Sequence, residues 1–591
     1  MANRNEGSLR IKYLKVISLL FLSFIVFTLL TSCKNEKPLK VNQINGWTIL
    51  SDNRENALKV IRASGEYDIN HLQLSHKIVH KLKHLRQEEN RKLTNELIDS
   101  AHAKGIDEVV LWDHALYWLG YYPDKFKTGP DSTLNLDNPE LWEWIKNDYR
   151  EMLDLAPNAD GIVLTFIETG AHVEDQYSEK LTSEAEKLAL LVNEISKVII
   201  DERNLKFYIR TFIYFPSELN AVLECLDLIE NKSIIVMSKE VPHDFFLTHP
   251  RTFWIDRINF PVIVEFDCTH EYNGQGVVSS IFPQVHLNRW KNYQTMPNVK
   301  GYVARTDRYE QSTIIGRPSE INLFALARAV EDSLIRAEEV FESYIFKEYG
   351  EQAIPYLKPA FENAYNVVTS VWYTLGLPLN SHSRMTFDNV WSYTGMVSGR
   401  WMDEPVTTIE HNVNKQFHYW KDLVNHLASP EIKSNKGYLG REILWDKIEN
   451  GWFDTTEQMD MEYLNYIIKE KDYGVGLAQK SLNNIVKADE VIEDSLKYKI
   501  LYHTFKRTEL SARLYRGVAK AYFGYRVYSR AKEYQTEELH EIIKSGMEEG
   551  RKVAELIKNY PVNEPSASYK WRQDAEIAME YINMIAYKLK Q

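Results

Sequence analysis

The chain has 591 residues and a formal net charge of −12, with 44% apolar and 12% aromatic residues. This length predicts two or three domains, and the apolar content is typical of a packed globular protein. The acidic balance argues against a nucleic-acid partner, which requires a basic face.

The first 32 residues predict a secretion signal. A basic stretch comes first and an apolar stretch follows at 16–30, which is too short for a comfortable membrane span. The segment Leu30-Thr31-Ser32-Cys33 resembles a bacterial lipobox, in which the chain is cut before the cysteine and its thiol carries lipid. The basic residues are Arg4, Arg10, Lys12 and Lys15.

We therefore expect residues 1–32 to be removed, Cys33 to be lipidated and residues 33–60 to form a tether. The removed segment holds four cations and one glutamate, so the net charge falls from −12 to −15. The protein is then expected on the bacterial cell envelope, at the outer membrane, with the membrane face left open.

Residues 61–345 alternate short apolar runs with amphipathic stretches. Helical periodicity is clearest at 88–104, 139–155, 183–200 and 217–229. Repeated strand–helix alternation favours an α/β fold of the (β/α)₈ TIM barrel type, with an open doubly wound sheet as the alternative. The expected strands are 69–74, 108–112, 161–167, 206–212, 233–237, 262–266 and 301–304, with the eighth within 321–325.

Residues 346–591 lose the strand pattern. Long helical stretches at 410–427, 459–486 and 509–528 predict an all-α C-terminal domain. No fixed period indicates a helical repeat.

The cysteines and glycines give no sign of a metal or cofactor. Besides Cys33 there are only Cys225 and Cys268, whose apolar surroundings favour buried free thiols over a disulfide. No Cys/His cluster has zinc spacing, and no Gly-rich loop follows a strand in the phosphate-binding manner. We expect no metal and no cofactor.

Three carboxylates follow predicted strands, where a barrel gathers its catalytic groups. They are Glu168, Asp244 and Glu271. A single strand-end carboxylate often caps the next helix instead. Three at matching strand ends favour glycosidic-bond chemistry, because inverting hydrolysis uses one protonated and one ionised carboxyl group.

Two cations near these carboxylates suggest an acidic ligand. Arg210 lies between apolar neighbours and must find an anion, either Glu168 or Asp244 as a structural partner or a substrate carboxylate. Lys239 is the second cation. The other candidate substrate-binding residues are Trp112, His114, His172, His243 and Tyr272.

Three segments resemble consecutive motifs of the bacterial α-glucuronidases that trim glucuronoxylan. They are Tyr-Ile-Arg-Thr-Phe-Ile-Tyr at 208–214, Lys-Glu-Val-Pro-His-Asp-Phe at 239–245 and Thr-His-Glu-Tyr-Asn-Gly-Gln at 269–275. They occur in the family's order, and the resemblance covers about residues 65–400.

The resemblance implies Glu168 as general acid and Asp244 with Glu271 as the pair that activates water. It also implies Arg210 and Lys239 as ligands of the uronate carboxylate. The chain departs from the family where Leu164 replaces a lysine, where 169–175 replaces a Gly/Pro-rich stretch, and where no room remains for an amino-terminal β-sandwich.

Three functions fit this sequence, each with a uronic-acid-containing oligosaccharide as partner, a lipid-anchored attachment to the membrane and no nucleic acid. The leading one is inverting hydrolysis of non-reducing-terminal glucuronic acid. The second is an oligosaccharide dehydratase of the kind associated with ulvan degradation, in which His172, His243 or Glu271 removes the C5 proton and the 4-hydroxyl leaves. The third is a non-catalytic glycan-binding lipoprotein.

Overall fold

The computed structural model describes residues 43–129, 131–213, 218–247, 249–308, 312–374, 377–378, 383, 385, 460–561 and 570–591. The signal segment 1–32, Cys33 and the expected helix at 410–427 lie outside these residues, so they stay predictions. Among the helices within these ranges, none combines the length and apolar character needed to cross a membrane.

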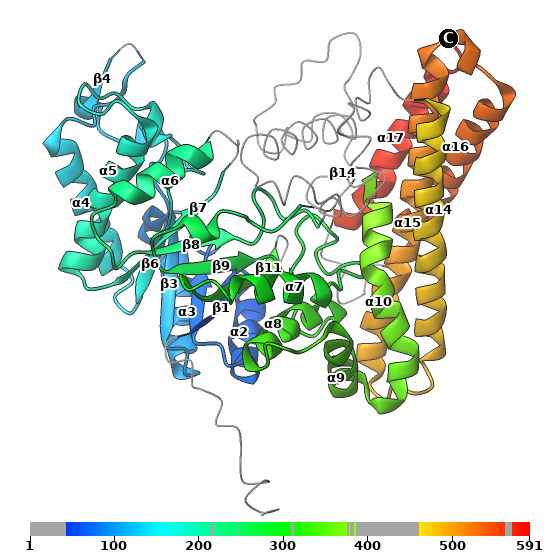
Figure 1. Cartoon of the computed structure of the whole chain (residues 1–591), viewed down its shortest axis with the longest axis horizontal. Coiled ribbons are helices and arrows are strands. Elements are labelled where there is room, and N and C mark those ends of the chain that lie inside the picture. The colour runs from blue at the N-terminus through cyan, green and yellow to red at the C-terminus, as the bar shows by residue number, and fades with distance from the viewer. Residues whose placement is uncertain are drawn as a thin grey trace, which may run out of the picture. The chain divides into compact units, whose positions relative to one another are not determined.

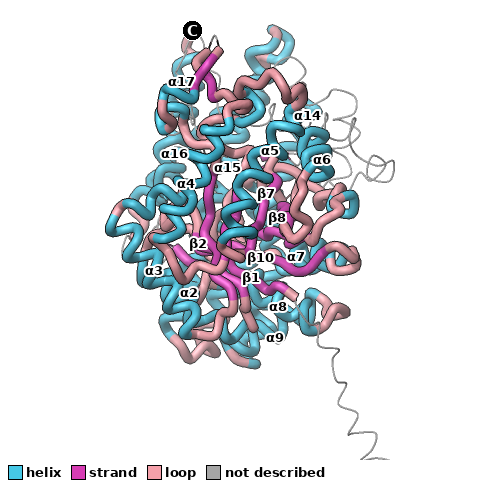
Figure 2. The backbone as a smooth tube through the Cα atoms, turned by 90° about the vertical axis from the view of Figure 1, so that its left-hand side faces the viewer, coloured by secondary structure: helices cyan, strands magenta, loops and turns pink. Residues whose placement is uncertain are grey.

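Eight parallel strands close into a barrel, which confirms the predicted fold class and excludes the open sheet (Figures 1 and 2). A cluster that includes Trp112, Tyr208 and Met237 fills its interior. In chain order the strands are β1 (Ile44–Ile49), β2 (His71–Leu74), β3 (Glu108–His114), β6 (Gly161–Thr165), β7 (Lys206–Thr211), β8 (Ile235–Lys239), β9 (Val262–Phe266) and β10 (Val299–Arg305).

The first strand corrects two expectations. β1 begins at Ile44, inside the expected tether 33–60, and pairs with both β2 and β10 to close the barrel. The segment 321–325, expected as the eighth strand, instead opens helix α8 (Ile321–Glu331). The apolar pattern of β1 is interrupted by Asn45, Gly46 and Thr48. Gly46 is nevertheless required, because a Cβ there would meet His71 at 2.8 Å.

Helices follow most barrel strands, and several of them begin with a capping side chain. Ser183 and Glu186 form a capping box at α5, and Asn138 caps α4 just before a proline at its first position. The helices are α2 (Arg54–Ala63), α3 (Glu88–Ala103), α4 (Pro139–Asp154), α5 (Glu184–Ser196), α6 (Glu218–Leu228), α7 (Pro283–Tyr293) and α8.

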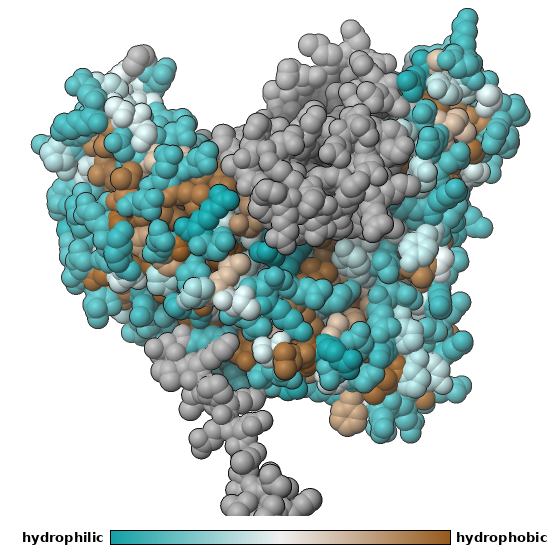
Figure 3. All heavy atoms as spheres, in the orientation of Figure 1, coloured by the Kyte–Doolittle hydropathy of each residue, from teal (hydrophilic) through white to brown (hydrophobic). Residues whose placement is uncertain are grey.

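The C-terminal region is helical, as predicted (Figure 1). The first helix after the barrel, α9, crosses the expected boundary between residues 345 and 346. Polar side chains cover most of the described surface in Figure 3. The helices are α9 (Ala337–Tyr349), α10 (Ile354–Val371), α14 (Met461–Lys487), α15 (Ser495–Arg530), α16 (Glu537–Lys558) and α17 (Gln573–Lys588).

Side chains of the helical region bind the loops that follow the barrel strands. The hydroxyl of Tyr373, just after α10, accepts a hydrogen bond from Leu247 N at 3.0 Å and donates one to Asn273. Arg507 of α15 donates to the Val277 carbonyl at 2.7 Å, and Thr508 accepts from Ser279 N at 2.9 Å. The helical region therefore fixes the loops after β8 and β9.

Helices α15 and α16 approach closely through glycines, so we expect Gly546→Ala to destabilise the helical region by about 1–3 kcal/mol. A Cβ at Gly546 would lie 2.7 Å from both Ala521 N and Gly517 O, which are backbone atoms that cannot swing away. Urea unfolding measures the change. The matched control is Gly476→Ala on α14, where nothing lies within 4 Å and stability should rise by about 0.5–1 kcal/mol. Equal effects of the two changes would contradict the close packing.

The two described cysteines are free and buried, as predicted. Burial raises the pKa of the Cys225 thiol to about 12, so this thiol is protonated and unreactive at neutral pH.

Candidate active site

The carboxyl ends of neighbouring barrel strands bring most of the predicted site residues to one rim. Glu168 follows β6 and Arg210 lies in β7. Lys239 ends β8, with Asp244 in the loop after it, and Glu271 follows β9. Parallel strands of a barrel all end at the same face.

An alternating chain of charges runs along this rim. Arg210 donates from Nη1 to Glu168 at 3.2 Å and from Nε to Glu265 at 2.7 Å. Arg305 then donates from Nε to Glu265 and from Nη1 to Glu271, both at 2.9 Å. Arg308 closes the chain with a bond of 2.6 Å to the other Glu271 oxygen.

Glu265 is the centre of this chain. Its side chain is fully buried and receives both Arg210 and Arg305. Burial by itself raises the pKa of a carboxyl group, but the two guanidinium groups outweigh it and lower the pKa of Glu265 to about 2. The carboxylate is therefore ionised at every physiological pH.

Lys239 and Asp244 form a second pair. Lys239 Nζ donates to Asp244 Oδ1 and to the His243 carbonyl, each at 3.0 Å, and it lies over the rings of Phe212 and Phe245. Burial disfavours the charged form of Asp244, but Lys239 and His243, with a hydrogen bond from Tyr272, hold the pKa of Asp244 well below its usual range. Asp244 is thus an ionised carboxylate.

The three predicted catalytic carboxylates differ in access to solvent. The Glu168 side chain is 41% exposed and that of Asp244 is 25% exposed, whereas that of Glu271 is 4% exposed. Both oxygens of Glu271 are held by arginines. Glu168 and Asp244 are therefore the two that a substrate can reach most readily.

Aromatic and histidine side chains pack beside Arg210. The Trp112 ring lies 5.0 Å from the Arg210 guanidinium and 5.5 Å from the ring of His76. His114 donates from Nδ1 to the His80 carbonyl at 2.6 Å and stacks on the His80 ring at 3.8 Å. Trp112 and His114 thus lie next to the charged rim, but both side chains are buried, and their role as substrate ligands stays a prediction.

The remaining predicted ligands lie in the loops. The His243 ring nitrogen is 3.9 Å from Asp244 Oδ2, and the Tyr272 ring packs on Phe246 at 4.4 Å. His172 pairs with Glu174 at 2.9 Å, and this hydrogen bond raises the pKa of His172. His172 therefore belongs to a separate pair in the loop after β6.

Sequence reasoning missed Glu265, Arg305 and Arg308. A signal was present for the first two, because Glu265 lies in the apolar run 262–266 and Arg305 ends the apolar run 302–304. A charge inside a buried strand needs a partner of opposite charge. Within the described ranges, no group of three or more His, Cys, Asp or Glu side chains is placed to hold a metal ion.

No family model and no curated protein matches the sequence. Solved structures match the fold. A GH138 enzyme targeting pectin rhamnogalacturonan II aligns with a TM-score of 0.54 at 12% identity, over 92% of this chain and 67% of that one. This likeness shows a barrel followed by a helical region.

Two further similar structures are an O-GlcNAc hydrolase mutant of Thermobaculum terrenum and the protein CpGH84B. Their TM-scores are 0.44 and 0.43, each at 12% identity over 92% of this chain. The alignments cover 93% and 77% of those chains, respectively. Membership of the α-glucuronidase family stays a prediction.

Proposed function

We propose that the protein is a carbohydrate-active enzyme that hydrolyses non-reducing-terminal glucuronic acid from polysaccharide-derived oligosaccharides with inversion. The observation that carries this proposal is the rim on which carboxylates alternate with arginines. Two reachable carboxylates supply acid and base, and the cations favour a substrate that is itself an anion.

We assign the substrate carboxylate to Arg210, which is bonded to the reachable Glu168. Its Nε and Nη1 bind glutamates, while its Nη2 makes no hydrogen bond within the described part of the chain. Burial of the guanidinium, whose side chain is 2% exposed, strengthens a charge-assisted bond to a bound anion. A uronate that binds there lies beside Glu168, the carboxyl group that this proposal takes as general acid.

Asp244 then serves as the base. It is ionised and partly exposed, and water activation requires both properties. Glu271 holds Arg305 and Arg308 in place. Lys239 stabilises the ionised form of Asp244 and, in this proposal, also attracts the acidic substrate.

The test is incubation of the protein with a glucuronate-capped oligosaccharide, followed by mass spectrometry and NMR of the products. Released glucuronic acid with inverted anomeric configuration supports hydrolysis. A product that has lost one water but kept its aglycone supports dehydration instead of hydrolysis. An unchanged ligand that nevertheless binds supports a glycan-binding protein.

Dehydration is the second candidate because neutral histidines lie beside the cations. Burial, with Arg308 and Arg305 nearby, holds the pKa of His76 well below its usual range, so its imidazole is neutral. In this reaction a base takes the C5 proton, the C–H electrons form the C4–C5 double bond, and the 4-hydroxyl leaves as water after gaining a proton. The product is an unsaturated uronate, as expected for a role in ulvan breakdown.

We expect Arg210→Ala to weaken binding of a glucuronate-terminated ligand by about 2–5 kcal/mol more than binding of its glucose-terminated counterpart. Lys239→Ala should act in the same direction. Calorimetric titration of both ligands measures the difference, with Arg150→Ala as a control because that arginine pairs with Glu202 at an exposed site. Equal losses for the charged and neutral sugars would refute an acidic substrate.

We also propose that the protein is anchored to the bacterial cell envelope through Cys33, because the sequence before it resembles a lipobox. Cys33→Ser should then yield an unprocessed precursor without lipid, since the thiol is the acylation site. Metabolic labelling with a fatty acid and membrane fractionation test this. A Cys33→Ser protein that still carries lipid would exclude this anchor.

A further inference from the structure

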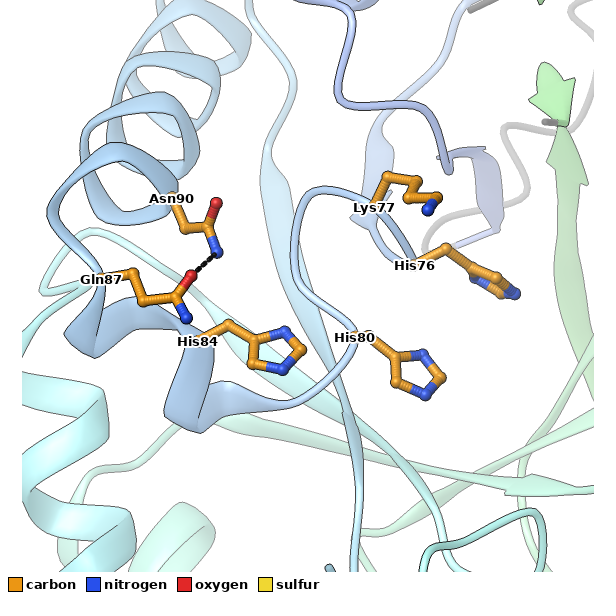
Figure 4. A pocket seen from close by; sticks show the side chains of 6 residues that line it. All are labelled: His76, Lys77, His80, His84, Gln87 and Asn90. Atoms are coloured by element: carbon orange, nitrogen blue, oxygen red, sulfur yellow. Dashed lines mark hydrogen bonds between the residues drawn. The ribbon is translucent and has the colours of Figure 1, made fainter. Parts of the chain in front are cut away.

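A cavity of about 440 Å³ lies beside the charged rim. It is bounded by the loop after β2, by the short helix at Leu82–Arg86 and by the start of α3. Figure 4 shows the six side chains that line it, with a hydrogen bond of 3.0 Å from Asn90 to Gln87. They are His76, Lys77, His80, His84, Gln87 and Asn90. None of these side chains is acidic.

Several donors in this cavity have no protein acceptor. Among the described residues, the Lys77 ammonium group makes no ion pair, and the rings of His80 and His84 make no hydrogen bond. Lys77 is exposed and His84 is half-buried, and Lys77, His80 and His84 all line the cavity. A neutral imidazole still carries one N–H donor.

The electrostatic environment of the cavity is positive. Burial lowers the pKa of His80 to about 4, and Lys81 and His84 add to the effect. Burial also lowers the pKa of His84, with Lys83 and Lys81 contributing. Positive charge that is not balanced within the cavity lining attracts an anion.

The cavity is adjacent to the proposed active site, because two of its lining histidines pack against rings beside Arg210. His80 stacks on His114, and His76 lies against Trp112, whose ring faces Arg210. Trp112 and His114 are themselves buried, so these contacts place the cavity beside Arg210 and its ring neighbours.

We propose that this cavity is an anion subsite that binds a sulfate or carboxylate group on the sugar next to the terminal uronate. The assignment rests on the proposed function, because it takes Arg210 as the site of the terminal sugar. Lys77 supplies charge, and His80 and His84 supply N–H donors. The preferred substrate is then an oligosaccharide with acidic groups on two successive residues.

Three disaccharides test this subsite. Each has a terminal glucuronate, linked to a sulfated sugar, to a second uronate or to a neutral sugar. The double variant Lys77→Gln/His84→Gln, made in a Glu168→Gln background to prevent turnover, should bind one or both acidic ligands about tenfold more weakly and the neutral ligand as before. Calorimetry gives the affinities, and KM in the wild-type background gives the same comparison kinetically.

The control is Lys104→Gln, which removes one positive charge at the exposed far end of α3. Loss confined to the sulfated or to the carboxylated ligand identifies which group the subsite takes. Equal affinity changes for all three ligands, no change for any of them, or failure of both acidic ligands to bind the Glu168→Gln protein would overturn the subsite. Failure of the proposed reaction appears differently, as absence of turnover of all three by the wild-type protein.

Discussion

Glu168→Gln should lower kcat on glucuronosyl oligosaccharides by about 10²–10⁴-fold, the usual contribution of a general acid. A sugar is a poor leaving group and needs a proton on its glycosidic oxygen, which an amide cannot supply. An activated aryl glucuronide leaves with little protonation, so its kcat should change little. Steady-state kinetics on the two substrates measure the contrast.

The pH dependence of the rate provides a second test of the Glu168→Gln substitution. The wild-type rate should follow a bell-shaped profile, because one carboxyl group must be protonated and another ionised. Glu168→Gln should remove the limb at higher pH, where the acid loses its proton. The matched control is Glu174→Gln, the same chemical change in the same loop at a residue paired with His172, and it should keep the profile.

Equal losses of kcat on the sugar and aryl substrates would show that Glu168 is not the general acid. Ultraviolet absorbance from a C4–C5 double bond conjugated to the carboxylate, with the aglycone still attached, would replace hydrolysis by dehydration.

Glu265→Gln should lower the free energy of unfolding by about 3–5 kcal/mol, because it leaves two buried arginines around a neutral amide. The midpoint and slope of urea unfolding measure this loss. The control is Glu96→Gln. That carboxylate pairs with Arg54 where the two side chains are 39% and 58% exposed, so the loss should stay below about 1 kcal/mol.

The pH dependence of stability follows from the lowered pKa of Glu265. This pKa falls from 4.5 to about 2 on folding, so the unfolded chain takes up a proton first as the pH falls. The stability that Glu265 provides is present above about pH 4.5 and is lost as the pH falls toward 2. The Gln variant should lose stability less steeply over this interval, and equal slopes for the two proteins would contradict an ionised Glu265.

Much of the barrel could be predicted from sequence because its strands are apolar runs of strongly β-forming residues. Val262–Phe266 shows this pattern clearly. The sequence did not predict β1, because Asn45 and Gly46 resemble a linker. Only pairing with β2 and β10 makes this segment a strand. The run at 321–325 was misassigned because a short apolar run has the same appearance in a buried helix.

The candidate site was predictable where a carboxylate or cation follows a strand. Arg210 and Asp244 lie on the rim as expected, and Glu168 is bound to Arg210. The pairing of Arg305 with both Glu265 and Glu271 joins residues far apart in sequence. Such contacts depend on closure of the barrel, which no local pattern encodes.

The bonds from the helical region to the barrel loops also have a consequence for synthesis. Tyr373 and Arg507 follow β10 in the chain, yet they bind the loops after β8 and β9. At ribosomal rates of about 5–20 residues per second, Arg507 emerges on the order of tens of seconds after β10. Until then the Val277 carbonyl lacks this partner. The loops at the barrel rim can therefore adopt their final conformation only after the C-terminal helices have been synthesised.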